Sequence, residues 1–130
     1  MRYQLHDCTI DSIVLENQRI VFSFPDGFFI VDENGQALKP LKKKLAFLID
    51  TNGFPLESSL YIRRIKRSRR GWKEISFKQF SSLFKKGNMV IHDEYDSKFT
   101  NWKMIQLNAC TSWSNIELYI TDIADIECFE

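Results

Sequence analysis

The sequence predicts an α+β fold that is mainly β: an antiparallel meander or sandwich, or a strongly curved sheet, with one amphipathic helix at about residues 77–86. Apolar and polar residues alternate along several short stretches, which is typical of half-buried strands. Asp-Gly and Asn-Gly pairs at 26–27 and 34–35 mark tight turns. One stretch combines the helical spacing of apolar residues with capping residues at both ends.

The length and composition predict one domain over residues 1–130. A chain of 130 residues is long enough to bury a core of its own. Its hydrophobic content of 44% and aromatic content of 14%, with eleven phenylalanines, are those of a packed globular protein. The sequence contains no internal repeat and no linker that would divide the chain.

The first strands are expected between residues 10 and 31. Residues 10–15 are rich in β-branched side chains, and residues 19–24 alternate so that Ile20, Phe22 and Phe24 share one face. The Asp-Gly turn that follows predicts a hairpin, with residues 28–31 as the partner strand of residues 19–24. These segments together predict an antiparallel meander.

The middle of the chain is less clear. Residues 36–56 carry several lysines and a Gly and Pro break, and residues 45–49 fit either a short helix or a strand. Residues 60–65 favour a strand that runs into a cluster of arginines.

The helix at 77–86 has the best-defined ends. Ser76 is a favourable N-cap residue, and Gln79 three positions later completes a capping box. Ile75 and Phe80 are placed for a hydrophobic staple across this end. Gly87 can provide the left-handed residue that ends the helix. The apolar face consists of Phe77, Phe80, Leu83 and Phe84.

Four more strands are expected after the helix, at 89–95, 102–109, 116–121 and 124–129. In the third, Ile116, Leu118 and Ile120 are expected to face inward. Glu117, Tyr119 and Thr121 then face outward.

The three cysteines, Cys8, Cys110 and Cys128, are odd in number and include no C-x-x-C pair. This pattern argues against a disulfide framework and against a structural zinc site, and predicts free thiols in a reducing compartment. The first residues lack the features of a signal peptide, and no apolar run is long enough to cross a membrane. We therefore expect a cytoplasmic protein that does not associate with membranes and binds no cofactor.

Charge is distributed unevenly along the chain. Residues 1–37 have a net charge of −4, residues 38–88 of +11 and residues 89–130 of −6, although the total is only +1. A basic middle segment between two acidic arms favours recognition of a charged partner.

The densest part of the basic segment is residues 63–73, with seven cationic residues and no acidic one. Guanidinium groups bind phosphate and carboxylate, and an indole can stack on a base. A nucleic acid or an acidic protein is therefore a candidate partner, and a solvated hairpin tip is the structural alternative. The candidate binding residues here are Arg63, Arg64, Arg67, Arg69, Arg70 and Trp72.

Both histidines stand beside an aspartate, in Leu5-His6-Asp7 and in Ile91-His92-Asp93-Glu94. Because neighbours in a strand point to opposite faces, His92 and Glu94 form the pair expected to share a face. His6, His92 and Glu94 are weak metal candidates, and hydrogen-bonded or surface histidines are the favoured interpretation. No nucleophile motif and no glycine-rich phosphate loop is present, so no catalytic residue is assigned.

Aromatic residues concentrate in the acidic last third of the chain, where they are suited to bind a basic partner protein. Trp113, between two serines in an expected loop, is the candidate exposed anchor.

The opening residues Leu5, His6, Asp7, Ile10 and Ile13, with the alternating strand and Asp-Gly turn that follow, resemble a group of small bacterial β-rich proteins. Some of that group look like immunity proteins of polymorphic toxin systems. The resemblance covers about the first 30 residues and, more weakly, the C-terminal strands. It implies a stand-alone protein that masks a partner, and no catalytic residue carries over.

The sequence therefore favours a non-enzymatic protein-binding domain, immunity-like or regulatory. A nucleic-acid-binding protein that uses residues 63–73 is the first alternative. A small enzyme or metal protein that uses the His-Asp pairs is the second. The oligomeric state is not predicted.

Overall fold

The computed structural model describes residues 2–38, 40–41, 43–66, 71–97, 101–109 and 114–130. In chain order the elements are β1 (Arg2–Gln4), β2 (Thr9–Ile10), β3 (Ser12–Glu16), β4 (Arg19–Ser23), β5 (Phe29–Val31), β6 (Lys44–Ile49), η1 (Leu56–Ser59), β7 (Leu60–Lys66), β8 (Trp72–Glu74), α1 (Phe77–Ser82), η2 (Leu83–Lys86), β9 (Met89–Asp96), β10 (Lys103–Ala109), β11 (Ser114–Ile120) and β12 (Ile123–Phe129). The η elements are 3₁₀ helices.

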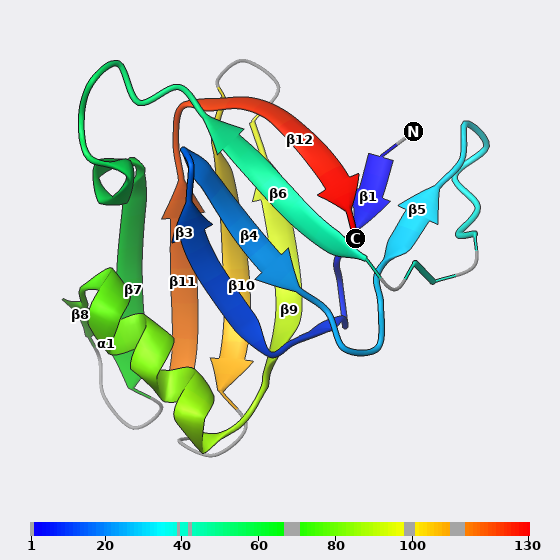
Figure 1. Cartoon of the computed structure of the whole chain (residues 1–130). Helices are drawn as coiled ribbons and strands as arrows, with labels where there is room; N and C mark the ends of the chain where they lie inside the picture. The colour runs from blue at the N-terminus through cyan, green and yellow to red at the C-terminus, as the bar shows by residue number, and fades with distance from the viewer. Residues whose placement is uncertain (1, 39, 42, 67–70, 98–100, 110–113) are drawn as a thin grey trace.

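In the part of the chain that the structure describes, the strands form three antiparallel sheets. The largest has the order β2-β9-β10-β11-β7-β8, the second β12-β6-β4-β3, and β1 pairs with β5. Figure 1 shows the two larger sheets facing one another, with α1 at the end near β7 and with β1 and β5 at the other end. The prediction of a mainly β, α+β fold with one short helix is confirmed.

The core lies between the two larger sheets. Inward-facing residues from both sheets are almost completely buried, because alternate residues of each strand point into the same interior. Phe22 illustrates this packing, since its ring contacts those of Phe24 and Phe47 at centroid distances of 6.2 and 5.4 Å. The buried opening residues Leu5, Ile10 and Ile13 belong to the same core, so the N-terminal motif has a packing role.

The expected hairpin between residues 19–24 and 28–31 is wrong. β4 pairs with β3 and β6, whereas β5 pairs with β1. The Asp-Gly turn is instead held against Leu41, whose backbone exchanges hydrogen bonds of 3.1 and 2.8 Å with Phe28. Gly27 has φ +86°, and a Cβ there would lie 2.8 Å from the carbonyl oxygen of Leu41. This contact directs the chain away from β4.

The remaining strand predictions are confirmed. Residues 45–49, which fitted a helix or a strand, lie in β6, where apolar residues pack on both sides of the backbone. The strand expected at 60–65 is β7, and the four strands expected after the helix are β9 to β12. Ile116, Leu118 and Ile120 face the core as expected.

The helix begins as predicted and ends differently. Ser76 Oγ accepts a hydrogen bond from the Gln79 amide, and Gln79 Oε1 accepts one from the Ser76 amide, which completes the capping box. The α-helix stops at Ser82, and residues 83–86 continue as a 3₁₀ helix. Gly87 has φ 146° and ψ 171°, an extended conformation open to glycine rather than the expected left-handed turn.

Replacement of Ser76 by alanine should lower the free energy of unfolding by about 1 kcal/mol, because the capping box loses its hydroxyl acceptor. The measurement is urea denaturation followed by circular dichroism. Ser82→Ala is the matched control in the same helix, and it should be neutral or slightly stabilising because alanine is the better helix former. An equal loss in both variants would contradict a specific capping role.

Within the described residues, no helix combines the length and the apolar character that crossing a membrane requires.

Candidate functional site

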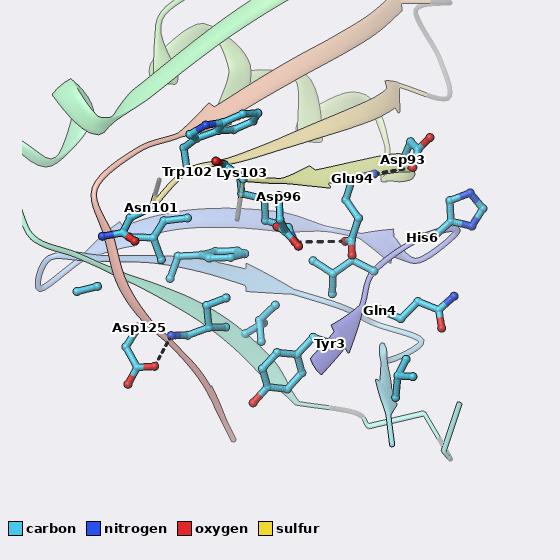
Figure 2. A pocket seen from close by; sticks show the side chains of 18 of the residues that line it. Tyr3, Gln4, His6, Asp93, Glu94, Asp96, Asn101, Trp102, Lys103 and Asp125 are labelled. Carbon is cyan, nitrogen blue, oxygen red and sulfur yellow. Dashed lines mark hydrogen bonds and ion pairs between the residues drawn. The ribbon is translucent and has the colours of Figure 1, made fainter. Parts of the chain in front are cut away.

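A cleft of about 880 Å³ opens between the two larger sheets near β1, and Figure 2 shows its lining side chains. β1 and the residues after it form one side, the end of β9 and the start of β10 another, and β6 and β12 the base. We call this site the acidic cleft. Among its described lining residues, four are carboxylates and one is a lysine: Asp93, Glu94, Asp96, Asp125 and Lys103.

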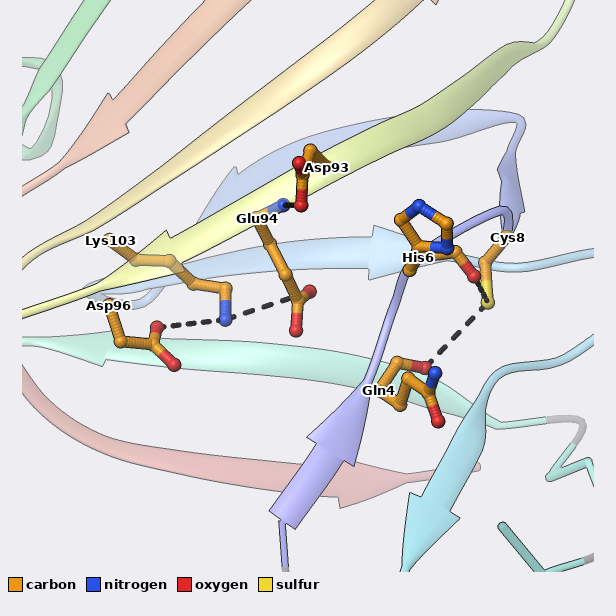
Figure 3. A network of polar contacts seen from close by, with 7 residues as sticks. All are labelled: Gln4, His6, Cys8, Asp93, Glu94, Asp96 and Lys103. Atoms are coloured by element: carbon orange, nitrogen blue, oxygen red, sulfur yellow. Dashed lines mark hydrogen bonds and ion pairs between the residues drawn. The ribbon is translucent and has the colours of Figure 1, made fainter.

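Lys103 is the best-buried charged side chain in the acidic cleft, with 7% of its side chain exposed. Its ammonium group lies 3.0 Å from the carboxylate of Asp96 and 3.7 Å from that of Glu94 (Figure 3). Asp96 is 68% exposed, whereas Glu94 is only 17% exposed. The lysine therefore joins an inner carboxylate to one at the solvent boundary.

Strand register places these three groups on one face. Lys103 is directly opposite Asp96, and Glu94 is opposite Ile105 on the β9–β10 ladder. The ladder shifts by one residue between Gln106 and Leu107, which leaves His92 as the extra residue of a bulge in β9. Because the bulge reverses the alternation of β9, Glu94 faces the interior together with Ile91.

Burial raises the pKa of Glu94 above its ordinary value, while the Lys103 ammonium opposes that shift. The Oε2 atom of Glu94 is buried and has no hydrogen-bond partner among the described residues; the ammonium of Lys103, at 3.7 Å, is the cation it faces. A buried carboxylate oxygen without a hydrogen-bond donor is costly, so the ion pair with Lys103 is the compensation that this oxygen has.

The two segments that contain the His-Asp pairs lie side by side. The Asp7 amide donates to the Ile91 carbonyl at 2.8 Å. Nearby, the pKa of Asp93 is lowered, mainly by a 2.9 Å hydrogen bond from the Tyr95 hydroxyl and next by one from the Glu94 amide. His6 itself pairs with Asp7 at 3.0 Å.

Cys8 is buried, and its thiol lies 3.8 Å from the Gln4 carbonyl oxygen (Figure 3). Burial raises its pKa to about 11, and the charge of Glu94 adds to the shift. The thiol is therefore protonated near neutral pH and is a poor nucleophile. Cys8 and Cys128 are both free.

The expectation that His92 and Glu94 share a face is wrong, because His92 is exposed at the bulge and Glu94 points inward. Within the described part of the chain, no three His, Cys, Asp or Glu side chains are placed to hold a metal ion together. His6 and Glu94 line the acidic cleft, whereas His92 does not.

Comparisons with protein-family models, with curated proteins and with solved structures found no match to this chain. The site is therefore interpreted from its own geometry.

Arg63 and Trp72, two of the predicted binding residues, lie together on the outer face of the largest sheet. The Arg63 guanidinium donates to Glu117 Oε1 from Nε at 2.9 Å, and to the Tyr119 hydroxyl at 3.1 Å. It also lies over the rings of Trp72 and Tyr119, at 4.9 and 5.4 Å from their centroids. A carboxylate from the acidic arm thus neutralises Arg63, although Trp72 remains 54% exposed.

Arg64 points to the opposite face of β7, because side chains alternate along a strand. Arg67, Arg69, Arg70 and Trp113 lie outside the described residues, as does Cys110.

The sequence analysis did not identify Lys103, Asp96, Asp125 or Tyr3 as site residues, although all four line the acidic cleft. One usable signal was present for Lys103 and Asp96. Two adjacent expected strands joined by a short connection place the end of one opposite the start of the next, which brings a lysine beside the carboxylates.

Proposed function

We propose that this chain is a non-catalytic protein-binding domain that receives a cationic side chain of its partner in the acidic cleft. The observation that supports this proposal is the excess of carboxylates over cations in the cleft, where four described carboxylates accompany the single ammonium of Lys103. An arginine or lysine of the partner offsets this excess of negative charge.

The walls of the cleft support the same ligand class. Tyr3, Trp102 and Asp125 line the cleft, and Figure 2 shows Glu94 extending from β9 toward the side on which Tyr3 lies. Aromatic rings attract ammonium and guanidinium groups through their negative faces. Asp125 is exposed, so it can steer an approaching cation from the solvent side.

The residues at the mouth of the cleft favour a polypeptide as the partner, either folded or in an extended conformation. Exposed residues from separate segments, including Gln4, His6, Asn101 and Asp125, form a polar rim around the half-buried interior. Protein interfaces have this arrangement of a buried centre inside a polar rim. A masking role, as the resemblance to immunity proteins implies, requires this kind of binding and no chemistry.

A test uses an arginine-containing hexapeptide and the same peptide with citrulline, which is the neutral isostere of arginine. In an NMR titration at about 50 mM salt, the arginine peptide should shift the amide signals of Tyr3, Glu94, Trp102 and Asp125 in a saturable manner. The citrulline peptide should bind at least about tenfold more weakly, as the loss of a charge-assisted hydrogen bond predicts.

Asp125→Asn keeps the side-chain shape and its 2.8 Å hydrogen bond from the Ile126 amide, yet removes the charge. It should weaken the arginine peptide several-fold, whereas Glu57→Gln, at an exposed acid in η1 outside the cleft, should leave affinity unchanged. Equal affinities for both peptides, or equal losses in both variants, would overturn the proposal. Capture of partners from an extract of the source cells should show the same dependence on Asp125.

A further inference from the structure

A row of outward-facing, mainly aromatic side chains crosses the largest sheet. We call it the tyrosine row, and its members on β9, β10, β11 and β7 are direct ladder partners of one another: Tyr95, Met104, Tyr119 and Tyr61. Adjacent residues in these strands, such as Ile105 and Leu118, belong to the core, so the row lies on the face turned away from the second sheet. Tyr95 is 46% exposed, and the other three members are partly exposed. The sheet therefore presents aromatic and apolar surface to solvent.

The next row of outward-facing side chains on the same ladders is acidic. From β9 to β8 its members are Asp93, Gln106, Glu117, Arg63 and Glu74. Three carboxylates against one guanidinium give this row a net charge of −2. The guanidinium is already bound by Glu117. A surface of this sign attracts a cationic ligand and repels phosphate groups.

Arg63 shows how this face holds a guanidinium group. Its guanidinium lies over the rings of Trp72 and Tyr119 and donates to Glu117 at 2.9 Å. An aromatic ring beside a carboxylate favours a cation, through cation–π attraction and a charge-assisted hydrogen bond. At this end of the face, the chain provides the cation itself.

The same combination of ring and carboxylate recurs on β9. Tyr95 and Asp93 are two residues apart in the strand and share the outer face, and the Tyr95 hydroxyl donates to the Asp93 carboxylate at 2.9 Å. Among the described residues, no arginine or lysine forms an ion pair with Asp93. Asp93 also lines the acidic cleft, so this end of the tyrosine row adjoins the cleft.

We propose that the tyrosine row is a docking surface for a basic polypeptide segment. An arginine or lysine of the segment lies on Tyr95 and Asp93, and an apolar neighbour packs on Met104 and Tyr119. Tyrosine and methionine are enriched at the centres of protein interfaces, and the charge of the adjoining row selects a cationic segment over a nucleic acid. The inference rests on the proposed function in that the same basic partner continues from the acidic cleft over β9 onto this face.

The test is an NMR titration at pH 8 and about 50 mM salt, conditions that keep histidines neutral and charge attraction strong. The probes are a hexapeptide with arginine beside leucine and the same peptide with citrulline. The Met104 methyl group and the rings of Tyr119 and Tyr61 report on the tyrosine row, whereas the amides of Tyr3 and Asp125 report on the acidic cleft. The arginine peptide should shift the first group of signals in a saturable manner. The citrulline peptide should bind there at least about fivefold more weakly.

Met104→Lys places a competing cation in the middle of the row and should weaken peptide binding there at least about tenfold. Val14→Lys is the matched control, because it adds the same charge at a side chain that is 47% exposed on β3 of the second sheet. It should change the affinity less than about twofold. Tyr95→Leu keeps an apolar side chain but removes the ring, and it should weaken binding at the row about threefold without changing the affinity at the cleft.

The two groups of signals separate this inference from the proposed function. Shifts at the cleft alone would overturn the docking surface and leave the proposed function standing, whereas shifts at the row alone would support the docking surface and contradict the cleft. Equal binding of both peptides at the row, or equal losses in Met104→Lys and Val14→Lys, would overturn the choice of a cationic segment. Tighter binding at the row by a six-nucleotide thymidine oligomer or by maltohexaose would assign the face to that ligand class instead and overturn the proposal.

Discussion

Lys103→Met should lower the free energy of unfolding by about 3 kcal/mol, toward the low end of the loss caused by removing one partner of a buried ion pair. Methionine keeps the length of the side chain but removes the ammonium group that lies between Glu94 and Asp96. Asp96 can rely on solvent because it is 68% exposed. Glu94 is largely buried, so its charge loses its nearest compensation.

A second substitution separates loss of the ion pair from loss of packing. Lys103→Met combined with Glu94→Leu should recover most of the stability, because the uncompensated carboxylate is removed as well. The measurement is urea denaturation of the wild type, both single variants and the double variant. A free energy of unfolding for Lys103→Met within about 0.5 kcal/mol of the wild type would show that the Lys103 charge contributes little to stability.

The stability that Lys103→Met loses relative to the wild type should also depend on pH. Burial raises the pKa of Glu94, and removal of Lys103 takes away the main opposing charge, so the folded variant binds a proton more readily than the unfolded chain. Its stability relative to the wild type should therefore rise as the pH falls through the raised pKa. The difference between wild type and Lys103→Met should be smaller at pH 4 than at pH 7. A difference that is constant over this range would argue against a charge on Glu94 as the cause.

The strands and the helix start were predictable because they depend on local signals. Alternation fixed the inward face of Ile116, Leu118 and Ile120, and the Ser76–Gln79 spacing fixed the capping box. Which strands pair with one another was harder to predict from the sequence. The Asp-Gly turn at residues 26–27 has hairpin chemistry, yet a backbone contact with Leu41 redirects the chain, and that contact joins segments that sequence patterns do not connect.

The acidic cleft could not be predicted from the sequence, because the bulge at His92 changes which side chains of β9 face inward. Strict alternation from Ile91 would place Asp93 and Tyr95 inside, and Glu94 and Asp96 outside. The extra residue reverses this order, and a bulge has no dependable signature in a single sequence. The ion pair between Arg63 and Glu117 could not be predicted for a different reason. The two residues are 54 positions apart in the sequence, and the pairing of β7 with β11 brings them together.

Segregation of charge along the sequence translates only in part into segregation in space. Arg63 of the basic segment is neutralised by Glu117 of the acidic arm. In the acidic arms, Arg19 pairs with Glu16 and Glu127. The four carboxylates of the acidic cleft nevertheless all come from the acidic last third of the chain.

Phe80→Ala should have the other large effect, a loss of about 3–5 kcal/mol in the free energy of unfolding. The ring is completely buried and is the main anchor of α1 in the core, with Phe84 at 5.5 Å and Phe77 at 6.3 Å between centroids. Truncation to alanine leaves a cavity that a six-residue helix cannot close without shifting from β7.

Phe54→Ala is the same substitution at a side chain that is 68% exposed, and it should cost less than about 0.5 kcal/mol.

Hydrogen exchange of the backbone amides in Phe80→Ala tests which elements unfold together. If Phe80 holds α1 to the sandwich, the helix amides should lose protection before those of β10 and β11, because the central strands keep their own ladders. Uniform loss of protection would mean that the helix and both sheets unfold as one unit.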